Sequence, residues 1–424
     1  MPGNAEVRGD GDWVTEAGRR ARLAARALAA SGTDARERAL RAAAAAIRDR
    51  GEAIAAANRE DVAAAAKRLS GAFLDRLVLT PERIEAMARG VEEVAALPDP
   101  VGRVLAEWDR PNGLRFRRVA CPIGVIGMIY ESRPNVGADA AALCVKSGSA
   151  VILRGGSESL NSARAIHAAM VAGVEAAGLP ADCVQNAPDA DRAHVAALLA
   201  ASGLVDLLIP RGGKSLVERV QREARVPVLA HAEGLCHTYV HRAADPAMAR
   251  AIVGNAKMRR TGICGATETL LIDADCAPAL LPGIVAELGR LGCSFRADAR
   301  ARAILPALPA AQPGDFDTEW LDAVLSVAVV DGVGEAVAHV NRHGSGHTDC
   351  IVTEDAEAAQ AFLAGTDGAV AMWNASTQFC DGGEFGFGAE IGISTGRVHA
   401  RGPVGPEQLC CFRTLVVGTG QLRP

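Results

Sequence analysis

The sequence of 424 residues has no run of about 18 apolar residues, the length that a transmembrane helix needs, because Arg, Asp and Glu interrupt every alanine-rich segment. It also has no excess of positive charge, since 45 Lys and Arg stand against 50 Asp and Glu, interspersed along the chain. The first 13 residues lack the cationic start and apolar stretch of a secretory signal. We therefore expect a soluble, cytoplasmic protein with neither nucleic-acid nor membrane partners.

The sequence also lacks the spacings of a disulfide framework or of a metal site. There is no C-x-x-C and no H-E-x-x-H, and we interpret the histidine pair of "HGSGH" at 343–347 as part of a loop rather than as a metal-binding tract. An odd number of irregularly spaced cysteines is typical of reduced thiols in a cytosolic protein, most of them small core residues. We expect no bound metal. The cysteines are residues 121, 144, 183, 236, 264, 276, 293, 350, 380, 410 and 411.

Two glycine-rich stretches fall short of known nucleotide-binding motifs. "LLIPRGGKS" at 207–215 is not a phosphate loop, because Leu208 occupies the place of the required first glycine. Its Gly212 and Gly213 could still bring backbone N–H groups to a phosphate at a helix start, or simply cap the helix. "GEFGFGAEIG" at 383–392 has the wrong spacing for a dinucleotide fingerprint and follows no strand.

The patterns that are present predict an α/β protein. Residues 12 to about 98 combine strong helix formers with an apolar face that includes Leu40, Ala44 and Ile47, which predicts packed helices. From about residue 120 onward, short apolar segments alternate with helical ones, the order expected of βαβ units and parallel sheets. Residues 373–406 are glycine-rich and irregular, as in loops that line a site. The length suggests two or three domains.

"RRTGICGATETLL" at 259–271 is the most informative stretch. Cys264 lies between Gly262 and Gly265, shortly after a group of cations, Lys257, Arg259 and Arg260. Cations and backbone N–H groups favour the thiolate form of a cysteine, and glycines let a substrate approach it. These features allow two interpretations, a nucleophile or a buried core thiol, and the residues alone do not choose between them.

Four stretches together resemble the aldehyde dehydrogenase superfamily: "CPIGVIGMIYESRPNV", "VILRGG", "RRTGICGATETLL" and the glycine-rich tail. More narrowly, "YESRPNV", "LIPRGG", "NASTQFCDGGEFGFGAE" and "STGRVHARGPVG" resemble its gamma-glutamyl phosphate reductase family. The resemblance runs from about residue 12 to the end. It implies NADPH-dependent reduction of L-glutamyl 5-phosphate to glutamate 5-semialdehyde and phosphate, in the biosynthesis of proline.

The resemblance also assigns roles to residues. Cys264 matches the nucleophile that forms a thioester, and Asn135 matches the asparagine that, with the backbone N–H of Cys264, stabilises the oxyanion. The water-activating Glu of the hydrolytic members is replaced by His231, with Glu233 two residues on. The loss suits an enzyme in which hydrolysis of the thioester would be wasteful.

For the cofactor, NADP or NADPH, Arg154 stands where the superfamily has a ribose-binding Lys, and an Arg beside small residues suits a 2′-phosphate. The expected cofactor-binding residues are Arg154, Gly155, Gly156, Ser157, Arg211, Gly212, Gly213 and Glu319. The substrate carries an amino-acid head group and an acyl phosphate, so cations and amides should bind it, although each could equally be structural. These candidates are Arg133, Arg259, Arg260, Asn374, Ser376, Thr377 and Arg401.

The implied architecture is aldehyde dehydrogenase-like. It has a Rossmann-like cofactor domain (1–230, interrupted by a β-arm segment at 106–121, with 369–395 returning to it), a catalytic α/β domain (231–368), and residues 396–424 as the second part of a β oligomerisation arm. Exposed ribbons invite pairing, so we expect a homodimer or higher oligomer. Glutamate 5-kinase, which makes the acyl phosphate, is a candidate partner. Two alternatives stay open: a CoA-acylating aldehyde dehydrogenase, and a cysteine acyltransferase without a cofactor.

Overall fold

The computed structural model describes residues 11–68, 71–131 and 133–423. The chain forms two compact units: the first contains residues up to Ala230 together with Gly386–Gly392 and the chain from Val404 onward, and the second contains His231–Phe385 and Ile393–Pro403. Within the described residues, every helix is too short or too polar to cross a bilayer.

The first unit begins with the helices that the sequence predicts. Leu40, Ala44 and Ile47 are fully buried on α2, which confirms the apolar face. Helix α2 packs against α7 so closely that a Cβ at Gly173 would lie 2.5 Å from the Cβ of Ala43. The helices are α1 (Gly11–Ala30), α2 (Thr33–Asp49), α3 (Gly51–Ala65), α4 (Gly71–Leu77) and α5 (Pro81–Ala96).

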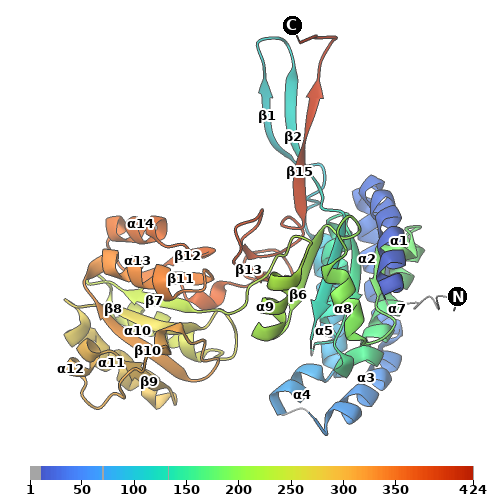
Figure 1. Cartoon of the computed structure of the whole chain (residues 1–424). Helices are drawn as coiled ribbons and strands as arrows, with labels where there is room; N and C mark the ends of the chain where they lie inside the picture. Colours follow the sequence, from blue (N-terminus) through green and yellow to red (C-terminus); the bar gives the residue numbers. More distant parts are fainter. Residues whose placement is uncertain (1–10, 69–70, 132, 424) are drawn as a thin grey trace, which may run out of the picture. The chain divides into compact units, whose positions relative to one another are not determined.

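A parallel sheet in the order β5-β4-β3-β6 follows in the same unit. Its strand β6 is labelled in Figure 1. The continuous apolar run of β3 is buried at every position, as expected for a central parallel strand. The chain leaves β3 toward β4 and β5 and then returns to β6 on the other side, so the topology reverses between β3 and β6. In open α/β sheets, ligands bind at the carboxyl ends of the strands beside such a point. The elements are β3 (Val125–Tyr130), α6 (Val136–Lys146), β4 (Ala150–Arg154), η1 (Ser157–Ser159), α7 (Leu160–Ala176), η2 (Ala181–Cys183), β5 (Val184–Asn186), α8 (Arg192–Leu199), β6 (Leu207–Arg211) and α9 (Lys214–Glu223).

The second unit is built on a parallel sheet in the order β12-β11-β7-β8-β10-β9. Its elements are β7 (Cys236–Val240), α10 (Pro246–Met258), β8 (Thr267–Asp273), α11 (Ala277–Arg290), β9 (Ser294–Ala297), α12 (Ala299–Ile304), η3 (Asp315–Asp317), β10 (Val324–Val330), α13 (Gly332–His343), β11 (Thr348–Val352), α14 (Ala356–Gly365), β12 (Val370–Trp373) and η4 (Thr377–Phe379). We had expected residues 369–395 to return to the first unit. Because β12 pairs with β11, residues 369–385 instead belong to the second unit.

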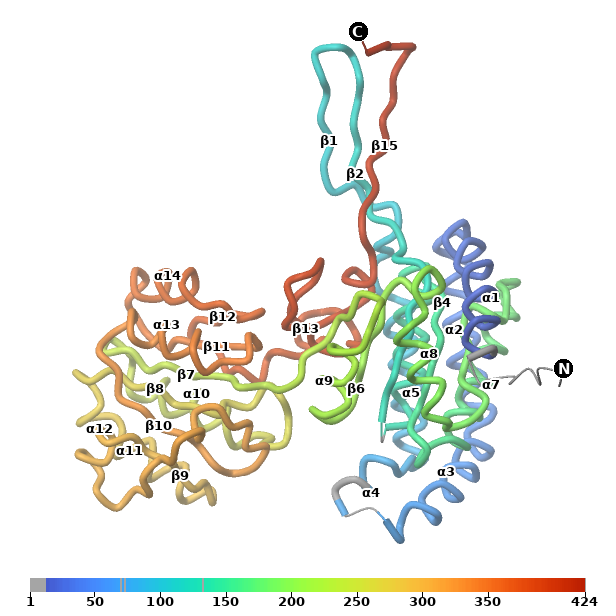
Figure 2. Tube along the Cα trace, viewed as in Figure 1, coloured from blue at the N-terminus to red at the C-terminus, as the bar shows by residue number. Residues whose placement is uncertain are grey.

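Segments far apart in the sequence form an antiparallel arm in the order β1-β2-β15 (Figure 2). The strands are β1 (Val104–Asp109), β2 (Arg115–Pro122) and β15 (Cys410–Val417). Residues 396–403, which we had expected in the arm, lie in the second unit, where β14 (Gly402–Pro403) pairs with β13 (Ile393–Ser394). The arm exposes large apolar side chains, among them Val104, Leu105, Trp108, Phe412, Leu415, Val416 and Val417.

Candidate active site

Cys264 lies in the loop that joins α10 to β8. Among the cysteines of the second unit, it is the one that is partly exposed, whereas Cys236, Cys276, Cys293, Cys350 and Cys380 are buried. Burial raises the pKa of Cys293 to about 11 and that of Cys350 to about 12, so these thiols stay protonated near neutral pH. The exposure of Cys264 favours the nucleophile over the core thiol.

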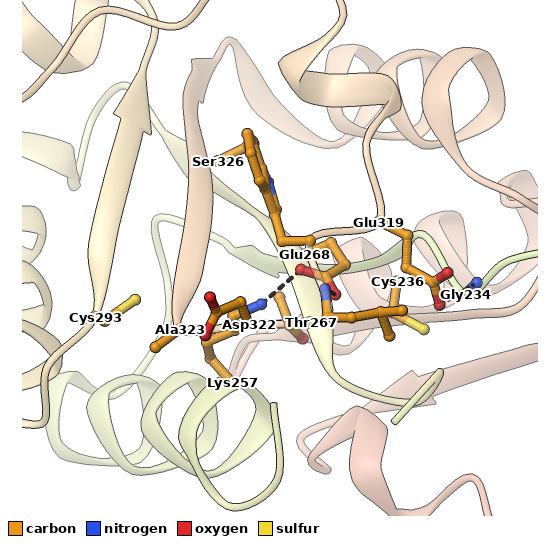
Figure 3. A network of polar contacts seen from close by, with 12 residues as sticks. Gly234, Cys236, Lys257, Thr267, Glu268, Cys293, Glu319, Asp322, Ala323 and Ser326 are labelled. Atoms are coloured by element: carbon orange, nitrogen blue, oxygen red, sulfur yellow. Dashed lines mark hydrogen bonds and ion pairs between the residues drawn. The ribbon is translucent and has the colours of Figure 1, made fainter. Parts of the chain in front are cut away.

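The chain around Gly234 packs directly onto the backbone of Cys264. A Cβ at Gly234 would lie 2.7 Å from the Cα of Cys264, closer than real Cβ contacts allow. The thiol of Cys236 donates to the carbonyl oxygen of Cys264 at 3.1 Å, and the N–H of Gly234 donates to Oε1 of Glu319 at 2.9 Å. Glu319 is therefore hydrogen-bonded to Gly234, the residue that packs against the backbone of Cys264. Figure 3 shows Gly234, Cys236 and Glu319.

A buried ion pair supports the segment that carries Glu319. Nζ of Lys257 lies 2.5 Å from Oε2 of Glu268, and the two side chains are 0% and 1% exposed. Oε1 of Glu268 accepts a hydrogen bond of 3.2 Å from the N–H of Leu321, a residue in the left-handed region with a φ of 51°. Burial raises the pKa of Glu268 to about 7, against the opposite effect of the Lys257 ammonium. The charge of Lys257, which we had counted among the cations near Cys264, is thus paired with Glu268.

Two histidines accompany Cys264: His231, which stands where the hydrolytic members have their water-activating Glu, and His347 of the "HGSGH" pair, which we had interpreted as part of a loop. One ring nitrogen each of His231 and His347 and the sulfur of Cys264 all lie within 4.8 Å of one another. Nδ1 of His231 lies 2.7 Å from the carbonyl oxygen of Ile393. The "HGSGH" pair separates: His347 joins this cluster, while Nδ1 of His343 bonds to Asp317 at 2.7 Å. Because the three residues come from distant segments, ligand spacing could not reveal the cluster.

The residues of the tail that we expected to bind substrate are mostly engaged in the structure itself. Both polar atoms of the Asn374 carboxamide bond to the backbone of Thr353, at 2.8 and 2.9 Å. Thr377 is fully buried and its hydroxyl lies 3.0 Å from that of Thr267. Ser376 is 5% exposed and its hydroxyl accepts from the N–H of Gln378. Asn374 would have to give up its present partner to bind substrate, whereas the Ser376 hydroxyl can still donate its hydrogen. The role of all three as substrate ligands stays a prediction.

The arginines of this unit differ in availability. Arg259 and Arg260 are exposed beside the Cys264 loop, and Arg259 donates to Oε1 of Gln378 at 3.3 Å. Gln378, which sequence reasoning missed, also donates to the carbonyls of Ala256 and Arg260 and so ties the end of α10 to η4. Arg401 donates to the carbonyl of Asp367 at 2.7 Å, which gives it a structural contact.

In the first unit, the expected cofactor residues gather at the carboxyl ends of β4 and β6. A Cβ at Gly213 would meet nothing within 4 Å, so there is open space at the start of α9, where helix N–H groups suit a pyrophosphate. Nε of Arg154 is buried without a hydrogen-bond partner among the described residues. Gly155, Gly156 and the exposed Ser157 follow directly. These features fit a dinucleotide.

Arg154 already has partners within the structure itself. Its terminal nitrogens donate to the carbonyls of Gly155 at 2.9 Å and Ala190 at 2.7 Å. A guanidinium has five N–H donors, so these two bonds do not exhaust Arg154, and its contact with a 2′-phosphate stays a prediction. Likewise, the carboxylate of Glu131 accepts from the N–H of Gly213 at 3.1 Å, and Arg211 lies 3.8 Å from Glu390.

Asn135 occupies the N-cap position of α6 in the same unit, although its side chain makes no capping hydrogen bond, and Arg133 two residues before it is exposed. Nδ2 of Asn135 donates to Oδ2 of Asp139 at 2.9 Å, which fixes the orientation of the carboxamide and leaves its second N–H to point elsewhere. Burial raises the pKa of Asp139 to about 6, while the Asn135 hydrogen bond and the Arg211 charge act in the opposite direction.

Comparison with known proteins shows the family of the chain. The aldehyde dehydrogenase family matches residues 6–300. The chain is 72% identical, over 95% of its length and 94% of the relative's, to a gamma-glutamyl phosphate reductase of Gluconobacter oxydans, and 67% identical, over 97% of both, to one of Acidiphilium cryptum. The crystal structure of a gamma-glutamyl phosphate reductase from Thermotoga maritima is 40% identical with a TM-score of 0.95, covering 97% of this chain and 100% of that one. The chain thus belongs to the aldehyde dehydrogenase family and, within it, to the gamma-glutamyl phosphate reductases, which are oxidoreductases.

Proposed function

We propose that this protein reduces L-glutamyl 5-phosphate with NADPH to L-glutamate 5-semialdehyde and phosphate, the second step of proline biosynthesis from glutamate. The observation that carries the proposal is the partial exposure of Cys264, between small residues, in a chain of this family. The open helix start at Gly213 supports a dinucleotide, and NADPH rather than NADH is taken from the family resemblance. The contacts of Arg154 do not add to that preference.

Cys264 is the proposed nucleophile. Its sulfur attacks the acyl carbon of the substrate, the C–O bond to phosphate breaks, and a thioester remains on the enzyme. The cofactor, when bound, supplies the hydride that reduces this thioester. The resulting thiohemiacetal then loses its hydroxyl proton, the C–S bond breaks, and the thiol is restored by a proton.

We assign the movement of the thiol proton to His231. Its Nδ1 faces the carbonyl oxygen of Ile393 at 2.7 Å, so that nitrogen carries hydrogen and donates it. Nε2 is then the basic nitrogen, and a ring nitrogen of His231 lies within 4.8 Å of the Cys264 sulfur. His231 can take the proton when the thiol attacks and return it when the thiohemiacetal collapses.

Charge on the substrate needs donors and cations. Asn135 is proposed to donate to the carbonyl oxygen, because its anchor on Asp139 fixes its orientation before substrate binds. The exposed Arg133, Arg259 and Arg260 are proposed to meet the phosphate and carboxylate groups. Glu319, held by Gly234, is proposed to contact the ribose next to the nicotinamide.

We also propose that the protein is a homo-oligomer that associates through its arm. The eight-residue β15 is an edge strand whose outer side pairs with no strand in the described parts of the chain, and it carries exposed Val416 and Val417. Such an edge invites pairing with another chain. The family resemblance adds glutamate 5-kinase as a candidate partner.

The test runs the reaction backward, from glutamate semialdehyde, phosphate and NADP, and follows NADPH absorbance. We expect phosphate-dependent NADPH formation that Cys264→Ala abolishes and Cys411→Ser, an exposed cysteine on the arm, leaves intact. Replacing NADP by NAD measures the cofactor preference. Activity that persists in Cys264→Ala would refute the nucleophile, and turnover with coenzyme A but not with phosphate would favour the CoA-acylating alternative.

The cofactor-free acyltransferase alternative receives less support. A cysteine acyltransferase requires a histidine beside the cysteine and an Asp or Asn that orients this histidine. His231 meets the first requirement, but the partner of its Nδ1 is a backbone carbonyl. Failure of the protein to bind NADP or NADPH in a calorimetric titration would restore this alternative.

A further inference from the structure

The cluster of Cys264, His231 and His347 has the chemistry of a metal site. The three residues precede β8, β7 and β11, which are neighbours in the parallel sheet. Parallel strands begin at the same edge of a sheet, so the topology brings together ligands that lie 33 and 83 positions apart along the chain (264 − 231 and 347 − 264). Thiolate sulfur and imidazole nitrogen are the donors that zinc prefers.

Contacts behind the two rings prepare them as ligands. Nδ1 of His231 faces the carbonyl of Ile393 at 2.7 Å, and Nδ1 of His347 lies 2.9 Å from the hydroxyl of Thr348. Histidines that bind metals usually donate the other ring N–H to such an oxygen, which fixes the tautomer and the orientation of the ring. Both histidines are therefore set up to bind through Nε2.

Nε2 of His347 is a buried polar atom whose partner is absent from the described part of the chain. The residue is 1% exposed, and this nitrogen has no hydrogen-bond partner among the described residues. Leaving a buried polar atom unsatisfied is unfavourable, so such an atom calls for a contact that the chain itself does not supply, and a metal ion is one.

We propose that Cys264, His231 and His347 bind Zn²⁺ through one sulfur and two nitrogens, with the fourth position open to water. The ligand atoms lie within 4.8 Å of one another. Tetrahedral zinc with bonds of about 2.0–2.3 Å places its ligands about 3.5 Å apart, so closure requires movements of about 1 Å by the half-buried Cys264 and His231. Binding releases the thiol proton to solvent and occupies the sulfur, so zinc excludes an acyl phosphate from Cys264 and inhibits reversibly.

The test reads binding from a spectrum and so does not depend on the proposed reaction. Cobalt(II) replaces zinc in such sites and gives a sulfur-to-cobalt charge-transfer band together with the visible bands of tetrahedral cobalt. Protein freed of metal by a chelator is titrated with Co²⁺, and Zn²⁺ is then added. We expect saturating binding at one Co²⁺ per chain, both sets of bands, and their loss when zinc displaces cobalt.

Variants identify the ligands. Cys264→Ser should remove the charge-transfer band, and His347→Ala and His231→Ala should each weaken Co²⁺ binding at least about 10-fold. Cys411→Ser is the control, because the exposed Cys411 lies 3.5 Å from Cys121 and offers another thiol site on the arm. Circular dichroism checks whether His347→Ala, a change at a buried position, still folds. If it does not, His231→Ala, at a half-buried position, tests the histidine ligands instead.

Two outcomes would overturn the proposal. One is cobalt that binds without a charge-transfer band. The other is a band that survives in Cys264→Ser but disappears in Cys411→Ser, which would place the metal on the arm. In active protein, Zn²⁺ should inhibit and a chelator should restore the rate. If the protein binds cobalt as expected but lacks the proposed activity, the metal site stands and the proposed function fails.

Discussion

Gly234 lies against the backbone of Cys264, with space for a hydrogen atom but not for a methyl group. A Cβ built at Gly234 would be 2.7 Å from the Cα of Cys264, and the N–H of the same glycine holds Glu319 at 2.9 Å. Gly234 thus allows the Cys264 loop to approach this segment closely, and it also holds Glu319, a candidate cofactor ligand.

Gly234→Ala should therefore displace the Cys264 loop. We expect the rate of the reverse reaction to fall at least about 10-fold, since small misplacements of reacting groups cost up to about 100-fold, with a loss of stability of about 1–3 kcal/mol from overpacking. The control is Gly254→Ala in α10, where a Cβ would meet nothing within 4 Å. Gly254→Ala should keep full activity, and equal losses in both variants would contradict the packing argument.

Glu268→Gln should destabilise the second unit. The change leaves the fully buried Lys257 ammonium without its partner at 2.5 Å. Breaking one side of a buried pair typically costs about 3–5 kcal/mol, whereas replacing both sides is often neutral. Thermal unfolding followed by circular dichroism should show a lower midpoint for Glu268→Gln and recovery in the double variant with Lys257→Met. A double variant as unstable as the single one would show that the pair matters for another reason.

Asp139 should make stability depend on pH in the acid range. Burial raises its pKa from 3.8 to about 6, so between these values the folded protein binds more protons than the unfolded chain. Its contribution to stability is present below the lower value and is lost as the pH rises through about 6. The thermal midpoint of the wild type should therefore fall relative to that of Asp139→Asn between about pH 4 and pH 6.5. Parallel profiles for the two proteins would contradict the shifted pKa.

Val416→Asp should disrupt the oligomer. This side chain is 51% exposed on the edge strand β15, and a carboxylate there would have to be desolvated if another chain covers the arm. Light scattering after gel filtration should give a wild-type mass that is a multiple of the 43.8 kDa chain and a smaller mass for the variant. Leu23→Asp, at a 67% exposed position on α1 away from the arm, should leave the mass unchanged. A wild type of 43.8 kDa would refute the oligomer.

The spacing of apolar residues was enough to predict the helices near the start of the chain and the alternating strands and helices that follow. The apolar residues of α2 recur every three to four positions, and those of β3 follow one another without a break. Both patterns can therefore be seen directly in the sequence. The nucleophile candidate was also visible, because small residues and cations flank Cys264 locally. The sequence alone could not decide whether that thiol is exposed.

The polar residues of the tail show the limit of local reasoning. Asn374 and Thr377 have side chains typical of substrate ligands, yet Thr353 and Thr267, which lie 21 and 110 positions away, already engage them. Arg154 likewise meets carbonyls that a distant loop supplies. Whether a polar group is available depends on its partners in space, and the sequence does not show those partners.

The helical and strand patterns, the family resemblance and the candidacy of Cys264 can all be predicted without a structure, because each rests on residues that are close along the chain. Only the tertiary structure brought His231 and His347 to that cysteine and placed β12 in the second sheet. The physical reason is the order of the parallel strands. Crossover helices separate neighbouring strands by tens of residues, so the groups that meet at one edge of a sheet share no spacing that could be recognised in advance.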